Sequence, residues 1–193
     1  MVGLTAAVAG VLLARMLTQR TVVLEGGTFL PQPRTLAAFE LQDTRGARFD
    51  NASLQGRPHL LFFGFTYCPD VCPTTLATLA EVHAEPRLKA LSVLFVSVDP
   101  QRDTAAAVRE YLKAFSPDFI GVRGEPAAMA PLLKSLGGIA TRQSLPDGNY
   151  TMDHTAAIYL LDRQGRYAAV FTPPFTPTRL RQDLLRVAAA GWL

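Results

Sequence analysis

Short, continuous hydrophobic runs alternate along this chain with stretches in which apolar residues recur at helical spacing. The runs predict buried strands at residues 59–65, 91–99, 119–122, 156–162 and 167–171. The periodic stretches predict helices at residues 74–82, 104–115, 127–136 and 177–189. Residues 39–43 and 47–49 flank Arg45-Gly46 and predict an N-terminal hairpin.

This order of elements is typical of a single α/β domain with a parallel core sheet. Nearly half of the chain, 49%, is hydrophobic, so a domain over residues 34–193 can bury a full core without help from a metal or a disulfide. Ligands of such sheets gather beyond the carboxyl ends of the strands. Any thiol or metal chemistry at that edge is therefore expected to serve function rather than folding.

The two cysteines of the chain, Cys68 and Cys72, stand at that edge, between the strand at 59–65 and the helix that follows. The N-terminal end of a helix stabilises a thiolate, so we expect both sulfurs to be reactive. Proline suits the first helical position, which predicts Pro73 there, Cys72 as the N-cap and residues 68–71 as a tight turn.

The spacing of the pair favours chelation but does not settle the chemistry. Thioredoxin-like redox motifs have two residues between the cysteines, whereas Cys68 and Cys72 have three. A structural zinc site usually takes four protein ligands, and this chain offers two cysteines and three histidines with no second pair. Two thiolates and one imidazole suit copper, although zinc stays open.

The third ligand must be one of three histidines. His59 is expected at the far end of its strand and His83 two to three turns down the helix, so neither reaches the sulfurs. His154 directly precedes the strand at 156–162 and can lie beside the cysteine turn. Taken alone, a histidine at a strand start is more often structural than a ligand.

Polar residues also follow the strand at 91–99. Asp99 either orients His154 or a partner from behind, or merely ends the strand in a turn. The sequence Arg102-Asp103-Thr104 is typical of a helix cap with a local salt bridge.

Three separated segments, residues 63–73, 96–104 and 153–155, resemble the Sco/SenC copper proteins in sequence and in order, and the likeness runs from about residue 34 to 187. The resemblance implies a thioredoxin-like fold, with Cys68, Cys72 and His154 binding Cu(I) or Cu(II). His154 would then occupy the place where thioredoxins keep a cis-proline. Residues 137–143 depart from the family because they lack aromatic side chains, and Gly137-Gly138 predicts a mobile loop up to Tyr150.

The family role is to deliver copper to the binuclear CuA site of cytochrome c oxidase, or to keep the cysteines of that site reduced. Three functions therefore compete: a copper metallochaperone, a thiol-disulfide oxidoreductase that uses the redox pair Cys68 and Cys72, and a peroxidase or redox sensor. Only the first requires His154, and it is the function we expect. The chain is then a metal carrier rather than an enzyme, with no catalytic residue certain.

Residues 1–17 are apolar apart from Thr5 and Arg15, which is just enough for a bilayer span. We expect an N-terminal apolar helix over residues 1–20 that serves as membrane anchor or signal segment, and a tether over residues 21–33. A cleaved signal peptide, or an anchor that starts upstream, are the alternatives. Positive charge lies at the C-terminal end of the run, at Arg15 and Arg20, which argues against the orientation that would export the domain. The resemblance nevertheless favours a membrane-anchored domain on the periplasmic, extracytoplasmic side.

The formal net charge of +3 and the pI near 9.1 change this interpretation little. The charges are spread along the sequence without a cluster, so nothing points to a nucleic acid. They weakly favour an anionic membrane surface or an acidic partner, an attraction that salt screens. The expected partner remains the CuA-bearing oxidase subunit or another copper-accepting protein.

Overall fold

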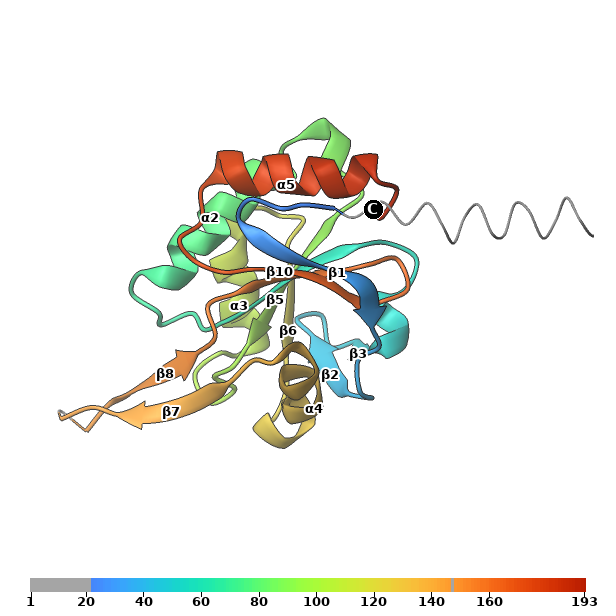
Figure 1. Cartoon of the computed structure of the whole chain (residues 1–193). Coiled ribbons are helices and arrows are strands. Elements are labelled where there is room, and N and C mark those ends of the chain that lie inside the picture. The colour runs from blue at the N-terminus through green and yellow to red at the C-terminus, as the bar shows by residue number, and fades with distance from the viewer. Residues whose placement is uncertain (1–21, 147) are drawn as a thin grey trace, which may run out of the picture.

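The computed structural model describes residues 22–146 and 148–193, in which an eight-stranded sheet forms the centre (Figure 1). The strand order is β1-β10-β9-β4-β5-β6-β2-β3, and β7 pairs with β8 in a separate two-stranded sheet. The strands are β1 Gly27–Arg34, β2 Glu40–Asp43, β3 Arg48–Asp50, β4 His59–Gly64, β5 Ser92–Ser97, β6 Ile120–Arg123, β7 Ala140–Ser144, β8 Tyr150–His154, β9 Ile158–Leu161 and β10 Tyr167–Phe171. The helices are α2 Val71–His83, α3 Ala105–Lys113, α4 Pro126–Leu136 and α5 Pro177–Ala189, with 3-10 turns at Asn51–Leu54 and Pro86–Leu88.

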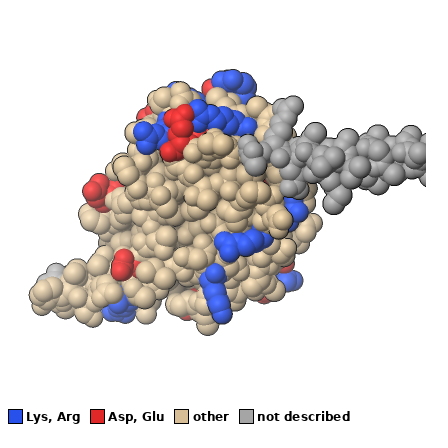
Figure 2. Space-filling model, in the orientation of Figure 1, with Lys and Arg blue, Asp and Glu red and all other residues tan. Residues whose placement is uncertain are grey.

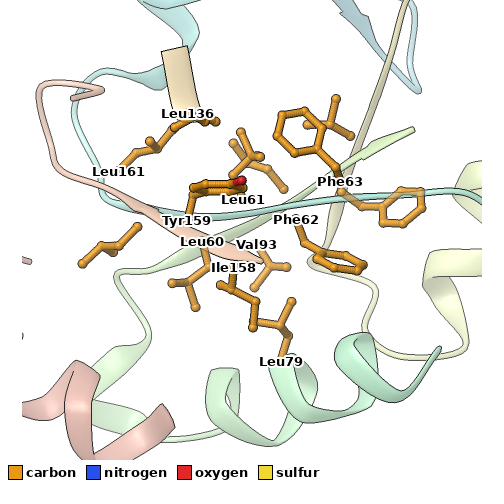
Figure 3. Close-up of a cluster of buried hydrophobic side chains, with 14 of the residues drawn as sticks. Leu60, Leu61, Phe62, Phe63, Leu79, Val93, Leu136, Ile158, Tyr159 and Leu161 are labelled. Carbon is orange, nitrogen blue, oxygen red and sulfur yellow. The ribbon is translucent and has the colours of Figure 1, made fainter. Parts of the chain in front are cut away.

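Strand β4 lies at the middle of the sheet, parallel to β5 and antiparallel to β9, and every residue in it is buried. Its side chains alternate between two layers of core, as side chains of a strand must (Figure 3). Leu61 and Phe63 lie with Tyr159 and with Leu136 of α4 on one side, while Leu60 and Phe62 face Leu79 of α2 on the other. Both faces are therefore covered, which explains the continuous hydrophobic runs of the sequence.

The predicted hairpin, core strands and helices are confirmed to within a few residues. Thr104 caps α3 by accepting a hydrogen bond from the backbone N–H of Ala107, and Thr176 caps α5 through Arg179. Gly137 ends α4 in the left-handed conformation, at φ +70°, which glycine adopts without strain. Helices α2 and α5 pack against each other on one face of the sheet.

The expected tether over residues 21–33 is wrong, because most of that segment belongs to the domain. Strand β1 pairs antiparallel with β10 at the edge of the sheet. Just before it, the buried carboxylate of Asp183 accepts hydrogen bonds from the backbone N–H groups of Glu25 and Gly26, at 2.9 and 2.7 Å. The sequence did not predict this strand because Pro31 and Pro33 lie within it, and proline usually argues against a strand. An edge strand nevertheless tolerates proline.

The segment between Gly137 and Tyr150, which we expected to be a loop, instead contains β7, and β7 pairs with β8 as an antiparallel hairpin. Its register pairs Ala140 with His154, so His154 ends β8 rather than opening a strand of the main sheet. Most of β7 is exposed, and its sequence, ATRQS, lacks the hydrophobic alternation that marks a half-buried strand. The hairpin projects away from the main sheet (Figure 1).

Residues 1–21, and with them the expected apolar helix, lie outside the described residues. Within residues 22–146 and 148–193, no helix combines the length and hydrophobicity that a bilayer span requires. On the face shown in Figure 2, charged side chains of both signs gather over α5, where Arg186 contacts Asp183 and Glu25, and most of the area below is uncharged.

We predict that Asp183→Ala lowers the free energy of unfolding by about 2–4 kcal/mol. The substitution leaves two backbone donors before β1 without their acceptor and removes the buried partner of Arg186. Urea denaturation would measure the change. Glu81→Ala, which removes an exposed carboxylate on α2, is the control and should stay within about 0.5 kcal/mol. Equal effects of the two substitutions would contradict the role given to Asp183.

Candidate metal centre

Cys68 lies in the turn between β4 and α2, and Cys72 lies in the first turn of α2. After β4 ends at Gly64, the backbone N–H of Cys68 donates to the carbonyl oxygen of Phe65 at 3.2 Å, and the N–H of Cys72 donates to Cys68 Sγ at 3.4 Å. Helix α2 begins at Val71 with Asp70 as N-cap, so the prediction of Cys72 as the cap is wrong. Pro73 is tolerated inside the first turn because N–H groups there have no intrahelical partner.

His154 comes to the cysteines from the end of β8. One donor atom from each of Cys68, Cys72 and His154 lies within 4.8 Å of the others, the one such trio of potential ligands found among the described residues. The shortest approach is 3.5 Å between Cys72 Sγ and His154 Nε2. The structure thus brings together all three residues predicted from the sequence. His59 lies buried at the start of β4 and His83 at the end of α2, away from the trio, as expected.

Hydrogen bonding leaves one nitrogen of His154 free to bind a metal. Nδ1 lies 3.3 Å from the carbonyl oxygen of Thr155, which can only accept, so Nδ1 carries the proton. Nε2 then presents its lone pair toward Cys72 Sγ. A trigonal site with metal–sulfur bonds of about 2.3 Å and metal–nitrogen bonds of about 2.0 Å separates sulfur from nitrogen by about 3.7 Å. The observed 3.5 Å fits a shared ion with little movement.

Burial favours the uncharged forms of Cys72 and His154 in the metal-free protein. Cys72 is fully buried, and desolvation raises the pKa of its thiol far above the ordinary value, which corrects the expectation of two reactive thiolates. Burial also lowers the pKa of His154. At neutral pH the pair is therefore a thiol beside a neutral imidazole. A metal ion must displace the Cys72 proton, which couples metal binding to proton release.

Aromatic side chains and one glycine shape the space around the trio. The rings of Phe62 and Phe65 meet the His154 imidazole edge-on, at 6.0 and 5.8 Å between centroids. A methyl group on Gly64 would lie 3.0 Å from Cys72 Sγ and 2.6 Å from the ring of Phe95. Gly64 therefore permits α2 to pack this closely, and no sequence signal distinguished it.

Asp103 holds Thr66, two residues before Cys68, in place. The expectation of a helix cap at this position did not include that role. Its fully buried carboxylate accepts hydrogen bonds from the hydroxyls of Thr66 and Ser97, each at 2.6 Å, and from the backbone N–H of Thr66. Burial raises the pKa of Asp103. Thr104 does cap α3, but nothing local marks the aspartate beside it as a link between two segments distant in sequence.

Asp99 is linked to His154 indirectly, through Tyr150 and the β7–β8 hairpin. Its carboxylate accepts from Arg102 Nε at 2.5 Å and from the Tyr150 hydroxyl at 2.8 Å, while Arg102 Nη1 donates to the carbonyl oxygen of Tyr150. The Arg102 guanidinium also lies 3.8 Å from the ring centre of Tyr150 and 4.8 Å from that of the exposed Tyr67. These contacts fix Tyr150, the first residue of β8, and His154 is the last residue of the same strand.

Comparisons with known proteins point to one family. Residues 29–189 match the family model described as SCO1/SenC. An SCO2-like protein of Rickettsia conorii is 35% identical over 150 residues, which cover 76% of this chain and 73% of the relative. The structure of Bradyrhizobium japonicum ScoI with copper bound is 41% identical, with a TM-score of 0.71, and the match covers 82% of this chain and 99% of that one.

A more distant structure, of BsSco, is 19% identical with a TM-score of 0.64 and covers 86% of this chain and 99% of that chain. It is described as a member of the Sco family of cytochrome c oxidase assembly proteins in which a disulfide switch was identified. At this identity the likeness concerns the fold. Together with the closer structural match, it confirms the predicted thioredoxin-like α/β fold.

We predict that the two thiols differ in reactivity. In the reduced, metal-free protein, alkylation by iodoacetamide should be at least about tenfold slower for Cys72, measured in Cys68→Ser, than for Cys68, measured in Cys72→Ser. Cys72 is buried with a raised pKa, whereas Cys68 is half-buried. The Cys72 rate should keep rising above pH 9, the ordinary cysteine pKa. Similar rates, with similar pH profiles, would argue against the buried thiol.

We also predict that Tyr150→Phe loosens the β7–β8 hairpin. Loss of the hydroxyl that donates to Asp99 should speed amide hydrogen exchange in the hairpin by about tenfold and leave exchange in β4 and β5 unchanged. Tyr67→Phe is the matched control, because its hydroxyl makes no hydrogen bond to the described residues while its ring faces the same arginine. If both substitutions act alike, the hydroxyl does not hold the hairpin.

Proposed function

The chain belongs to the SCO1/SenC family, and we propose that it is a copper metallochaperone that holds one copper ion on Cys68, Cys72 and His154. One observation carries the proposal: two sulfurs and an imidazole nitrogen with a free lone pair converge within 4.8 Å, at a turn fixed by the fold. Thiolates select soft ions such as Cu(I), and the imidazole also suits Cu(II).

Copper is favoured over zinc by the ligand count. A structural zinc ion takes four protein ligands, and the described residues around this turn supply three. The copper bound to B. japonicum ScoI supports the same choice, since that protein is 41% identical to this chain. Three ligands leave one side of the ion open, which is what a carrier requires.

Transfer is expected to proceed by ligand exchange from the Cys68 side. Cys72 is fully buried, whereas Cys68 is half-buried next to the exposed Tyr67, so an incoming ligand reaches the ion past Cys68. As the ion leaves, Cys72 recovers its proton, because its raised pKa favours the thiol. Proton return at the buried sulfur therefore helps release.

The acceptor that we propose is the binuclear CuA site of cytochrome c oxidase, on the subunit that carries it. The support is the family, of which BsSco is described as a cytochrome c oxidase assembly protein. Such a role requires the domain on the extracytoplasmic side of a membrane, and the apolar residues 1–17 offer an anchor. Fractionation of cells, with protease protection of the domain, would test this location.

A thiol-disulfide oxidoreductase is the second candidate, because the two free sulfurs lie within 4.8 Å and one of them is accessible. Cys68 would attack a partner disulfide as the thiolate, and Cys72 would then displace the partner's sulfur. The partner gains two electrons and two protons, and the chain is left with a Cys68–Cys72 disulfide. That oxidised pair cannot hold copper, so the two activities exclude each other at any moment.

The experiment that decides between them measures Cu(I) binding and thiol-disulfide exchange on the same reduced full-length samples. Competition with a chromophoric Cu(I) chelator should give one tightly held ion per chain. Affinity should fall by at least about a hundredfold in Cys68→Ala and Cys72→Ala, and by at least about tenfold in His154→Ala. His83→Ala is the control, since His83 lies outside the trio.

Copper binding that does not depend on His154, together with exchange activity that needs both cysteines, would refute the carrier and support the reductase. Copper binding that all three variants weaken, with little exchange activity, would support the carrier. For the Cu(II) form, loss of the sulfur-to-copper charge-transfer absorption in the cysteine variants would identify the same ligands.

A further inference from the structure

A cavity of about 430 Å³ lies at the end of the sheet opposite the metal centre. Ser92 and Ile120, the first residues of the parallel strands β5 and β6, line it, whereas the cysteine turn follows the last residue of β4. His83, at the end of α2, closes another side. Ligands of α/β sheets usually gather at the carboxyl ends of strands, so sequence reasoning gave no reason to expect a site here.

The lining of this cavity has more cationic than anionic side chains. Of the cationic side chains that line it, Arg45 pairs with Asp43 at 2.7 Å. Arg57, Lys89 and Arg109 form no ion pair with any of the described residues. Asp118, the one acidic residue in the lining, faces His83 Nε2 at 3.7 Å.

The arginine on α3 is held in position for a ligand. Arg109 Nη1 donates to the carbonyl oxygen of Thr44, which fixes the guanidinium without an ion pair to any of the described residues. The hydroxyl-bearing residues Thr44 and Ser92 also line the cavity. Guanidinium groups match the paired oxygens of phosphate and carboxylate, so the preferred ligand group is an oxyanion.

The rest of the lining is apolar, and the volume is larger than an oxyanion alone needs. Leu91, Phe119 and Ile120 form this part, and the ring of Phe119 meets His83 at 5.9 Å. Cavities of about 300–1,000 Å³ suit small molecules. A nucleic acid would instead need a basic stripe along the surface.

We propose that this cavity binds a small organic anion, with its phosphate or carboxylate group at Arg57, Lys89 and Arg109 and its apolar part against Phe119 and Leu91. The proposal is independent of copper binding, because no residue of the cavity belongs to the metal centre. Failure of one would leave the other intact.

Titration of the full chain, followed by NMR chemical shifts, tests the proposal with phenyl phosphate, benzoate, inorganic phosphate and benzyl alcohol. Phenyl phosphate or benzoate should saturate a single site and shift the amides of Ser92, Phe119 and Ile120. Whichever of the two binds more tightly identifies the head group. Inorganic phosphate should bind at least about threefold more weakly than phenyl phosphate because it cannot use the apolar part. Benzyl alcohol should not saturate the site, because it lacks the charge.

Two lysine substitutions provide the matched test of position. Lys89→Glu should weaken binding of the preferred anion by about tenfold or more, whereas Lys134→Glu, an equal charge change at an exposed position on α4, should not. Arg57→Gln should weaken binding in the same direction as Lys89→Glu. Copper stoichiometry should stay at that of the unsubstituted chain in all three.

Three results would overturn the proposal: no saturation by any of the anions, shifts that map outside the cavity, or equal weakening by Lys89→Glu and Lys134→Glu. Thermal unfolding of each variant, compared with the unsubstituted chain, identifies loss of fold. If Lys89→Glu unfolds, the comparison of Arg57→Gln with Lys134→Glu decides in the same way.

Discussion

Close packing of α2 against the end of β4 is the constraint on which the metal centre depends. Gly64 leaves room for the sulfur of Cys72, and a single added methyl group would lie 3.0 Å from it. That packing buries Cys72 completely, and burial raises the pKa of its thiol. The chemistry of the buried sulfur, including the proton it exchanges with a metal, therefore follows from how a helix sits on a strand.

Buried carboxylates fix the positions of the other two proposed ligands, Cys68 and His154. Asp103 ties Thr66, and so the start of the cysteine turn, to Ser97 at the end of β5. Asp99 and Arg102 tie Tyr150 to the same region, and the hairpin carries His154 from there to Cys72. The turn and the hairpin are thus anchored to one short segment, residues 99–103, which keeps the donors in register.

The sequence predicted what depends on local pattern and missed what depends on contacts distant in sequence. Core strands and helices follow from hydrophobic runs and caps, and the three candidate ligands followed from their residue types together with a family resemblance. Strand β1 was not predicted because it contains two prolines, which edge strands tolerate but which usually argue against a strand. Strand β7 was not predicted because its side chains are polar and mostly exposed. The role of Asp103 was missed because a buried aspartate and a capping aspartate look alike in sequence.

The hydrophobic core of this molecule does not include the candidate metal centre as its organising element, which fits the proposed role as a carrier. Hydrophobic side chains fill the core on both faces of β4, and burial favours the uncharged forms of Cys72 and His154. In small domains that fold only around a metal, the free energy of metal binding is used to order the chain. Here the three donor atoms already lie within 4.8 Å of one another, so binding of an ion does not require the chain to fold around it.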